Sequence, residues 1–120
     1  MSVHLHSLTF DCADPPAQAA FWAGVTGYRV EVSEPWLAIL GGDGSVGPRF
    51  MFIKVPEAKV AKNRVHLDLG TVDLEAEVAR VTALGAAVVG HRQEYGITWT
   101  TFTDPEGNEF CVGLHPPGEG

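Results

Sequence analysis

Two residues of a type that can do acid–base chemistry, His66 and Asp68, lie two positions apart in the segment HLDLG. In a β-strand, residues two apart point to the same face of the sheet, so the imidazole and the carboxylate can form a hydrogen bond. Such a pair can act as a general base or can simply orient a ligand. A structural carboxylate beside an interior histidine gives the same pattern, and the spacing leaves both interpretations open.

Aromatic residues in neighbouring segments point to a binding role. Trp36, Phe50, Phe52 and Trp99 lie in stretches that read as strands, and threonines flank Trp99. Aromatic walls with a few convergent polar groups suit a planar or apolar small molecule. Plain core packing is the alternative, and it applies more to Phe50 and Phe52 than to Trp99.

The elements that must position these residues occur twice. The stretches 6–30 and 66–89 share an order, namely an alternating strand, an Asp that can open a helix, an amphipathic helix, a Gly and an apolar strand. Asp14 and Asp73 occupy matching places in the two stretches. One such unit cannot bury its own apolar face, so we expect the two copies to pack together with a pocket where they meet.

Each half is predicted to form one βαβββ module, which makes the chain an α+β protein. Asp14 supplies an N-cap oxygen for a helix at about 15–25, and two prolines fit the first turn of that helix. The other elements follow from alternation, apolar stripes and turn residues. They are strands at 7–13, 28–32, 35–40 and 49–55, a glycine-rich turn at 41–47, a strand at 64–69, a helix opening at Asp73, strands at 86–89, 97–102 and 109–114, and a loose tail from His115.

The bulk properties fit one globular domain of 120 residues, with modules at about 3–56 and 64–115 and a polar linker at about 57–63. A net charge of −7 argues against nucleic acid and anionic membranes as partners, because both require a basic surface. No segment has the pattern of a secretory signal or the length of a membrane span. Cys12 and Cys111 read as buried thiols, and we expect a cytoplasmic protein.

Three segments, DCADPPAQAAFW, KNRVHLDL and DPEGNEFCV, in this order around the internal repeat, resemble the vicinal oxygen chelate superfamily, and within it the small glyoxalase-like and bleomycin-resistance-like proteins. The resemblance covers almost the whole chain. It implies paired modules whose mixed sheets curl around a cup, often in a homodimer. Members of the superfamily include lyases, isomerases, ring-cleaving dioxygenases and non-catalytic proteins that sequester antibiotics, and the fold does not choose among them.

Metal-using members take their ligands from the first and last strands of each module. The resemblance places those positions at Ser7, within 50–53, at His66 and at Cys111, with Glu109 on the same face as Cys111. Only His66 is a convincing ligand, and a divalent cation needs several converging donors. We therefore expect a cup without a metal or other cofactor, and no metal-dependent glyoxalase reaction. A divalent ion at His66 is the alternative.

The predicted function is binding of a small, partly aromatic or apolar molecule in this metal-free cup. The alternative is a lyase, isomerase or dioxygenase-type enzyme that uses His66 as a metal ligand, or His66 and Asp68 as an acid–base pair. Strand alternation adds polar residues of the first strand to the cup face. The predicted ligand-binding residues are Ser7, Thr9, Asp11, Trp36, Phe50, Phe52, His66, Asp68, Trp99 and Cys111.

Overall fold

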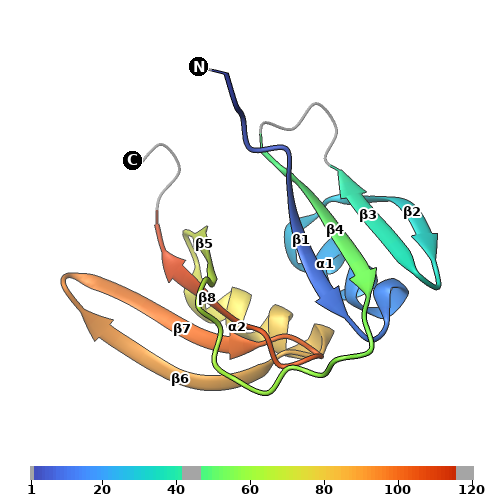
Figure 1. The fold of residues 1–120 in the computed structure, drawn as a ribbon. Helices are drawn as coiled ribbons and strands as arrows, with labels where there is room; N and C mark the ends of the chain where they lie inside the picture. Colours follow the sequence, from blue (N-terminus) through green and yellow to red (C-terminus); the bar gives the residue numbers. More distant parts are fainter. Residues whose placement is uncertain (1, 42–46, 116–120) are drawn as a thin grey trace. The chain divides into compact units, whose positions relative to one another are not determined.

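The computed structural model describes residues 2–41 and 47–115, and the chain divides into two compact units, Met1–Ala58 (unit 1) and Lys59–Gly120 (unit 2). The division falls inside the predicted linker. Each unit has one four-stranded sheet and one helix (Figure 1). Most of the predicted glycine-rich turn and the tail beyond His115 lie outside the described residues. Neither helix of the described chain has the length and apolar character needed to cross a membrane.

Unit 1 forms a mixed sheet in the order β1-β4-β3-β2, in which β1 and β4 are parallel and the other pairs are antiparallel. The helix begins after Asp14, whose Oδ1 accepts a hydrogen bond from the Ala17 amide at 3.2 Å, and ends at Gly27 in the left-handed conformation. The elements are β1 (Ser7–Cys12), α1 (Pro15–Thr26), β2 (Arg29–Glu34), β3 (Leu37–Gly41) and β4 (Arg49–Lys54).

Unit 2 repeats this topology in the order β5-β8-β7-β6, so the predicted pair of βαβββ modules is confirmed. Asp73 caps its helix as Asp14 does, with Oδ1 accepting from the Ala76 amide at 3.1 Å. Both modules even share a register shift, between Val30 and Val32 and between Val88 and Gly90. The elements are β5 (Leu67–Thr71), α2 (Leu74–Leu84), β6 (Ala87–Glu94), β7 (Ile97–Thr103) and β8 (Glu109–Leu114).

The core of unit 1 lies between its sheet and α1 and is rich in aromatic rings. The ring centroid of Phe10 lies 5.4 Å from that of Trp22 and 5.1 Å from that of Phe52, and Phe50 lies 5.8 Å from Trp22. The prediction that Phe50 and Phe52 form a wall of the cup is therefore wrong. Parallel pairing sets Phe50 beside Leu8 and Phe52 beside Phe10, on the helix side of the sheet.

The core of unit 2 is smaller. Phe102 and Phe110 stack with centroids 5.3 Å apart, and Val81 is the one buried residue of α2. The predicted turn DPEGN is structural, because the buried Asp104 carboxylate accepts hydrogen bonds from the Glu106 and Asn108 amides at 2.9 and 3.0 Å. These contacts fix the entry into β8 and hence the position of every side chain along it.

Candidate functional site

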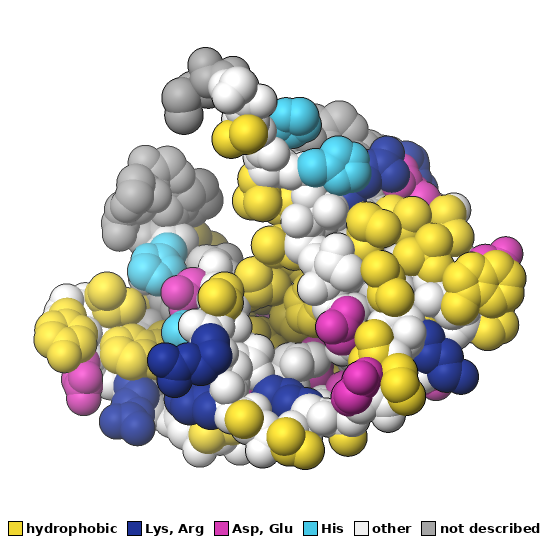
Figure 2. All heavy atoms as spheres, in the orientation of Figure 1, with side chains coloured by type: hydrophobic (Ala, Val, Ile, Leu, Met, Phe, Trp, Pro, Cys, Tyr) yellow, Lys and Arg dark blue, Asp and Glu magenta, His cyan; other side chains and the backbone are white. Residues whose placement is uncertain are grey.

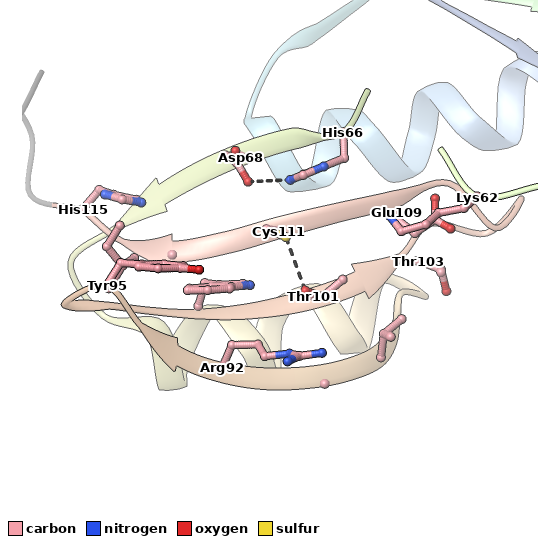
Figure 3. Close-up of a pocket in the computed structure, with 15 residues that line it drawn as sticks. Lys62, His66, Asp68, Arg92, Tyr95, Thr101, Thr103, Glu109, Cys111 and His115 are labelled. Carbon is pink, nitrogen blue, oxygen red and sulfur yellow. Dashed lines mark hydrogen bonds and ion pairs between the residues drawn. The ribbon is translucent and has the colours of Figure 1, made fainter. Parts of the chain in front are cut away.

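The open face of the second sheet forms a pocket of about 850 Å³ (Figure 3). Trp99, Thr101 and Cys111 line it, whereas the intervening residues Thr100 and Phe110 are buried. Strand alternation therefore separates a helix-facing core from a pocket-facing surface on β7 and β8. His66, which directly precedes β5, and Asp68 on β5 complete one edge of the pocket, and the β6–β7 hairpin supplies another.

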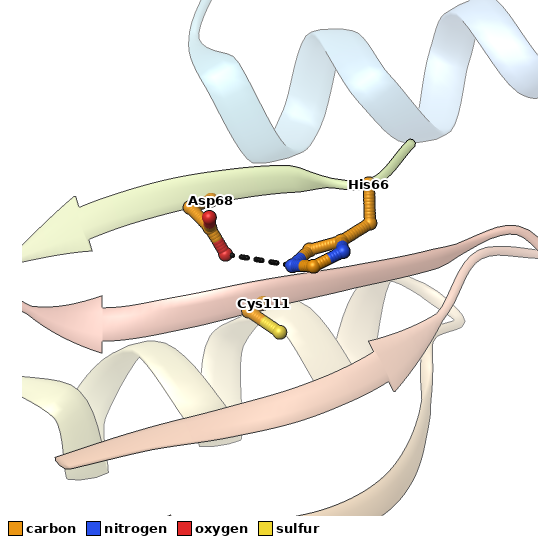
Figure 4. A group of neighbouring side chains, drawn as sticks. All are labelled: His66, Asp68 and Cys111. Carbon is orange, nitrogen blue, oxygen red and sulfur yellow. Dashed lines mark hydrogen bonds and ion pairs between the residues drawn. The ribbon is translucent and has the colours of Figure 1, made fainter. Parts of the chain in front are cut away.

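Three polar side chains converge at the β5 edge of this pocket (Figure 4). His66 Nε2 lies 3.1 Å from Asp68 Oδ1, so the predicted imidazole–carboxylate hydrogen bond is present. The parallel pairing of β5 and β8 sets Asp68 opposite Cys111. One donor atom from each of the three residues lies within 4.8 Å of the others. The catalytic role of His66 and Asp68 stays a prediction.

Cys111 is held as a neutral thiol at this site. Burial raises the pKa of its thiol, and the carboxylate of Asp68 raises it further. The Thr101 hydroxyl, 3.3 Å from Sγ, acts in the opposite direction. Because the pKa is raised, the free site holds little thiolate at neutral pH. The thiolate is the form that acts as a nucleophile and as a metal ligand.

The cluster fits part of a metal site. Imidazole, carboxylate and thiolate are ligands of borderline divalent cations such as Zn²⁺, and catalytic zinc sites use three protein ligands. His66 and Cys111 are two of the positions that the resemblance implies, and Asp68 is a donor that sequence reasoning did not count as a ligand. The expectation of a metal-free cup therefore stays a prediction.

Glu109, the other acid considered at this strand, is engaged elsewhere. Its carboxylate accepts a hydrogen bond from the Asn63 amide at 2.9 Å and pairs with Lys59 Nζ at 3.4 Å. The Asn63 amide is the main cause of the lowered pKa of Glu109, and Lys59 lowers it further. Glu109 thus fastens the segment before β5 to the start of β8 and does not join the donor cluster.

The predicted site residues of unit 1 do not belong to this pocket. Ser7, Thr9 and Asp11 share one face of β1, opposite the side on which Phe10 packs against α1, as alternation predicted. Trp36 lies in the turn between β2 and β3 with 62% of its surface exposed, so its placement on a strand was wrong. The binding roles of these residues stay predictions.

The pocket residues that sequence reasoning missed include Arg92, Tyr95 and His115. The first two lie beyond the predicted end of their strand, because β6 continues to Glu94 and the hairpin follows. His115 was assigned to a loose tail, yet its amide donates to the Thr71 carbonyl at 2.9 Å.

Two glycines within strands, Gly70 and Gly113, were the feature of the sequence that could have indicated the position of His115. A Cβ added at Gly113 would lie 2.9 Å from His115 Nε2, and one added at Gly70 would lie 3.1 Å from His115 Cβ. Glycine inside a strand often marks such a close approach of another group. His115 can therefore occupy this position because Gly70 and Gly113 have no side chains.

Comparisons with known proteins agree with this architecture. In solved structures, the chain is similar to a glyoxalase/bleomycin resistance protein/dioxygenase family enzyme from Burkholderia phytofirmans PsJN, with 17% identity over 93% of this chain and 98% of that chain and a TM-score of 0.76. It is also similar to the fosfomycin resistance protein FosX from Mesorhizobium loti, with 18% identity, coverage of 98% and 96%, and a TM-score of 0.75.

A bleomycin-binding protein complexed with bleomycin is a third structural relative, with 16% identity, coverage of 95% of this chain and 100% of that chain, and a TM-score of 0.66. At these identities the likeness shows the fold alone. No curated protein matches the chain. A family model described as "Glyoxalase-like domain" matches residues 7–113. The chain therefore belongs to the glyoxalase-like domain family.

Proposed function

We propose that this protein binds a small, partly aromatic molecule on the open face of its second sheet. The observation that supports this most directly is the pocket itself, in which Trp99 shares one floor with the polar cluster of His66, Asp68 and Cys111. An apolar surface with a few convergent polar groups is typical of small-molecule sites. The ring gives area for binding, and the polar groups orient the ligand.

The surroundings of the pocket support a binding role over a purely structural one. Phe102 and Phe110 fill the space beneath the sheet, so Trp99 is not needed to complete that core. The indole is instead left partly exposed beside Thr101 and Gly113. A structural relative is complexed with bleomycin, so the same fold can hold a small molecule in that protein.

Tryptophan fluorescence provides the test. The Trp36→Phe variant removes the exposed indole of unit 1, which leaves Trp99 as the pocket reporter and Trp22 as a fully buried background. Titration with a panel of planar aromatic compounds and matched aliphatic compounds is expected to give saturable quenching by aromatic members. Trp99→Ala should abolish binding as measured by calorimetry, whereas Trp36→Phe should not. A flat response to every compound contradicts the proposal.

A second function is supported by the donor cluster, namely binding of a divalent cation such as Zn²⁺ by His66, Asp68 and Cys111. A bound ion of this kind supplies a Lewis acid. The chain's own residues prepare the site, because Asp68 orients the imidazole and Thr101 contacts the thiol. Cation binding must displace the thiol proton, so affinity should rise with pH.

Cadmium titration tests this second function without reference to activity. Binding through Cys111 should produce an ultraviolet thiolate-to-metal charge-transfer band that is lost in Cys111→Ser and weakened in His66→Ala. Cys12→Ser is the matched control, since Cys12 is buried in unit 1 and donates to the Ile53 carbonyl. A band of equal strength in Cys111→Ser rules out this site.

We also propose that the protein acts as a homodimer in a reducing, cytoplasmic compartment. The dimer is carried over from the family resemblance, and the compartment is supported by the two free thiols, Cys12 and Cys111. Sedimentation velocity over a range of protein concentrations tests the dimer. A monomer at every concentration contradicts it.

A further inference from the structure

The hairpin between β6 and β7 holds a tyrosine in an unfavourable backbone conformation. Among the non-glycine residues that the structure describes, Tyr95 alone has a positive φ, at 55°, and Gly96 follows at 72°. Two successive positive φ angles suit a tight hairpin turn, where Asn, Asp and Gly are the favoured residues. A tyrosine side chain adds steric strain at this position without helping the turn.

The strained residue is also highly exposed. Tyr95 has 90% of its surface accessible, yet it lines the pocket, and Figure 3 shows its ring extending from the hairpin back over the open face of the sheet. Local strain that the free protein does not need is a recurrent feature of ligand-binding positions. The position of Tyr95 therefore indicates that its ring is kept for a contact with a ligand.

The charges around the ring favour a particular sign of ligand. Arg92 on β6 is the cross-strand partner of Trp99 on β7, and both line the pocket together with Lys62. On the face shown in Figure 2, Lys and Arg side chains lie beside apolar side chains over unit 2. Lys62 and Arg92 therefore place two positive charges at this pocket, although the whole chain has a net charge of −7.

The carboxylates that line the pocket are already engaged. Asp68 accepts from His66, and Glu109 is bound by Lys59 and the Asn63 amide. The pairing of Arg92 with Glu94 is loose, with 4.0 Å between the guanidinium Nη1 and the carboxylate Oε1. The Arg92 guanidinium can therefore turn toward an incoming anion without breaking a close ion pair.

We propose that the ligand of this pocket is a flat aromatic anion, whose ring contacts Trp99 and Tyr95 and whose acid group binds Arg92. The inference rests on the proposed small-molecule function and adds the chemical class of the ligand. Arginine suits such a ligand because its planar guanidinium can donate two parallel hydrogen bonds to a carboxylate. The neighbouring rings of Trp99 and Tyr95 supply apolar area beside that donor.

Three probes with one ring system test the sign of the charge. Calorimetry with 2-naphthoate, 2-naphthalenemethanol and 2-naphthylmethylamine should give the order carboxylate, alcohol, amine, with the carboxylate about tenfold tighter than the amine. Arg92→Gln should remove this difference by weakening the carboxylate alone. Arg29→Gln, which removes a charge from the sheet of unit 1, is the matched control and should change nothing. Equal binding of carboxylate and amine overturns the proposal.

A second variant tests the role of the strained tyrosine. Asn accepts a positive φ more readily than Tyr, so Tyr95→Asn should keep or raise the melting temperature. The same change should weaken 2-naphthoate by about tenfold, because one ring contact is lost. Glu34→Asn, at the end of β2 beside the hairpin of unit 1, should leave the affinity unchanged. A lower melting temperature in Tyr95→Asn, or an unchanged affinity, contradicts a ligand-binding role.

These outcomes separate the inference from the function on which it rests. If all three probes bind equally and Trp99→Ala abolishes binding, the pocket binds aromatic molecules but the anion proposal is wrong. If neither these probes nor the wider aromatic panel binds, the proposed function is wrong as well.

Discussion

The two units share one topology, but the core of unit 1 holds more aromatic rings than the core of unit 2. In unit 1, Phe10, Phe50 and Phe52 pack toward α1, and α1 buries six of its own residues. In unit 2, α2 buries Val81 alone among its residues, while Trp99 lies on the open face. The core of unit 1 is therefore the larger one, and the open face of unit 2 is the proposed binding surface.

The polar residues differ in the same way. The open face of unit 1 has Thr9 and Asp11 beside Met51 and Ile53, which are their partners on β4. The matching strands of unit 2 bring together His66, Asp68 and Cys111. The three clustered donor side chains therefore lie in the unit with the smaller core.

Matching positions at the start of the last strand sharpen the contrast. Arg49 begins β4 and forms an ion pair with Glu31 at 2.5 Å, whereas Glu109 begins β8 and binds Lys59 and the Asn63 amide. The pair in unit 1 joins two exposed or half-exposed side chains, and such pairs contribute little. Glu109 instead accepts a hydrogen bond from the backbone amide of Asn63, so its loss should cost more stability than the loss of an exposed ion pair.

The largest expected effect on stability is the difference between removing a core ring and removing a pocket ring. Trp22→Ala should lower the free energy of unfolding by about 3–5 kcal/mol, because Trp22 is fully buried among Phe10, Phe21 and Phe50. Trp99→Ala should lower it by about 1 kcal/mol or less, since its ring is partly exposed. Urea denaturation followed by circular dichroism measures both. Equal losses would remove the distinction between the two units.

A smaller effect is expected at Glu109, and it should depend on pH. The folded pKa of Glu109 lies below its ordinary value of 4.5, so its stabilisation is complete above that value and is lost as the pH falls through the folded pKa. Glu109→Gln should therefore cost about 1 kcal/mol at neutral pH, and the difference from wild type should shrink in acid.

Arg49→Gln is the matched change in unit 1, and it should stay within about 0.5 kcal/mol of wild type at neutral pH because its ion pair is largely exposed. Thermal unfolding across a pH series measures both variants. A Glu109→Gln deficit that persists unchanged into acid would show that the lost contact does not depend on the carboxylate charge.

The smallest expected effect is on thiol reactivity. Burial and Asp68 raise the pKa of Cys111, so Asp68→Asn should accelerate alkylation of Cys111 and Thr101→Val should retard it, each by about threefold at mildly alkaline pH. Iodoacetamide kinetics in a Cys12→Ser background give the rates as a function of pH. If Asp68→Asn retards alkylation, the carboxylate is not the neighbour that suppresses the thiolate.

Local signals in the sequence were sufficient for most of the fold. The repeated Asp caps at Asp14 and Asp73 and the alternation of each strand predicted two βαβββ modules. The same alternation predicted that His66 and Asp68 share a face and can form a hydrogen bond. These features depend on residues within a few positions of one another, so the chain determines them without knowledge of distant contacts.

Only the tertiary structure decided which strand faces meet which partners. Alternation shows that Phe50 and Phe52 share one face of their strand, but it does not show which face of the sheet that is. Pairing with β1 places both residues on the side that packs against α1. Asp68 joins Cys111 because β5 and β8 pair in parallel across more than forty positions of chain, and His115 folds over Gly113 at the end of the same strand. Register between distant strands follows from the packing of whole faces, and local sequence does not encode it.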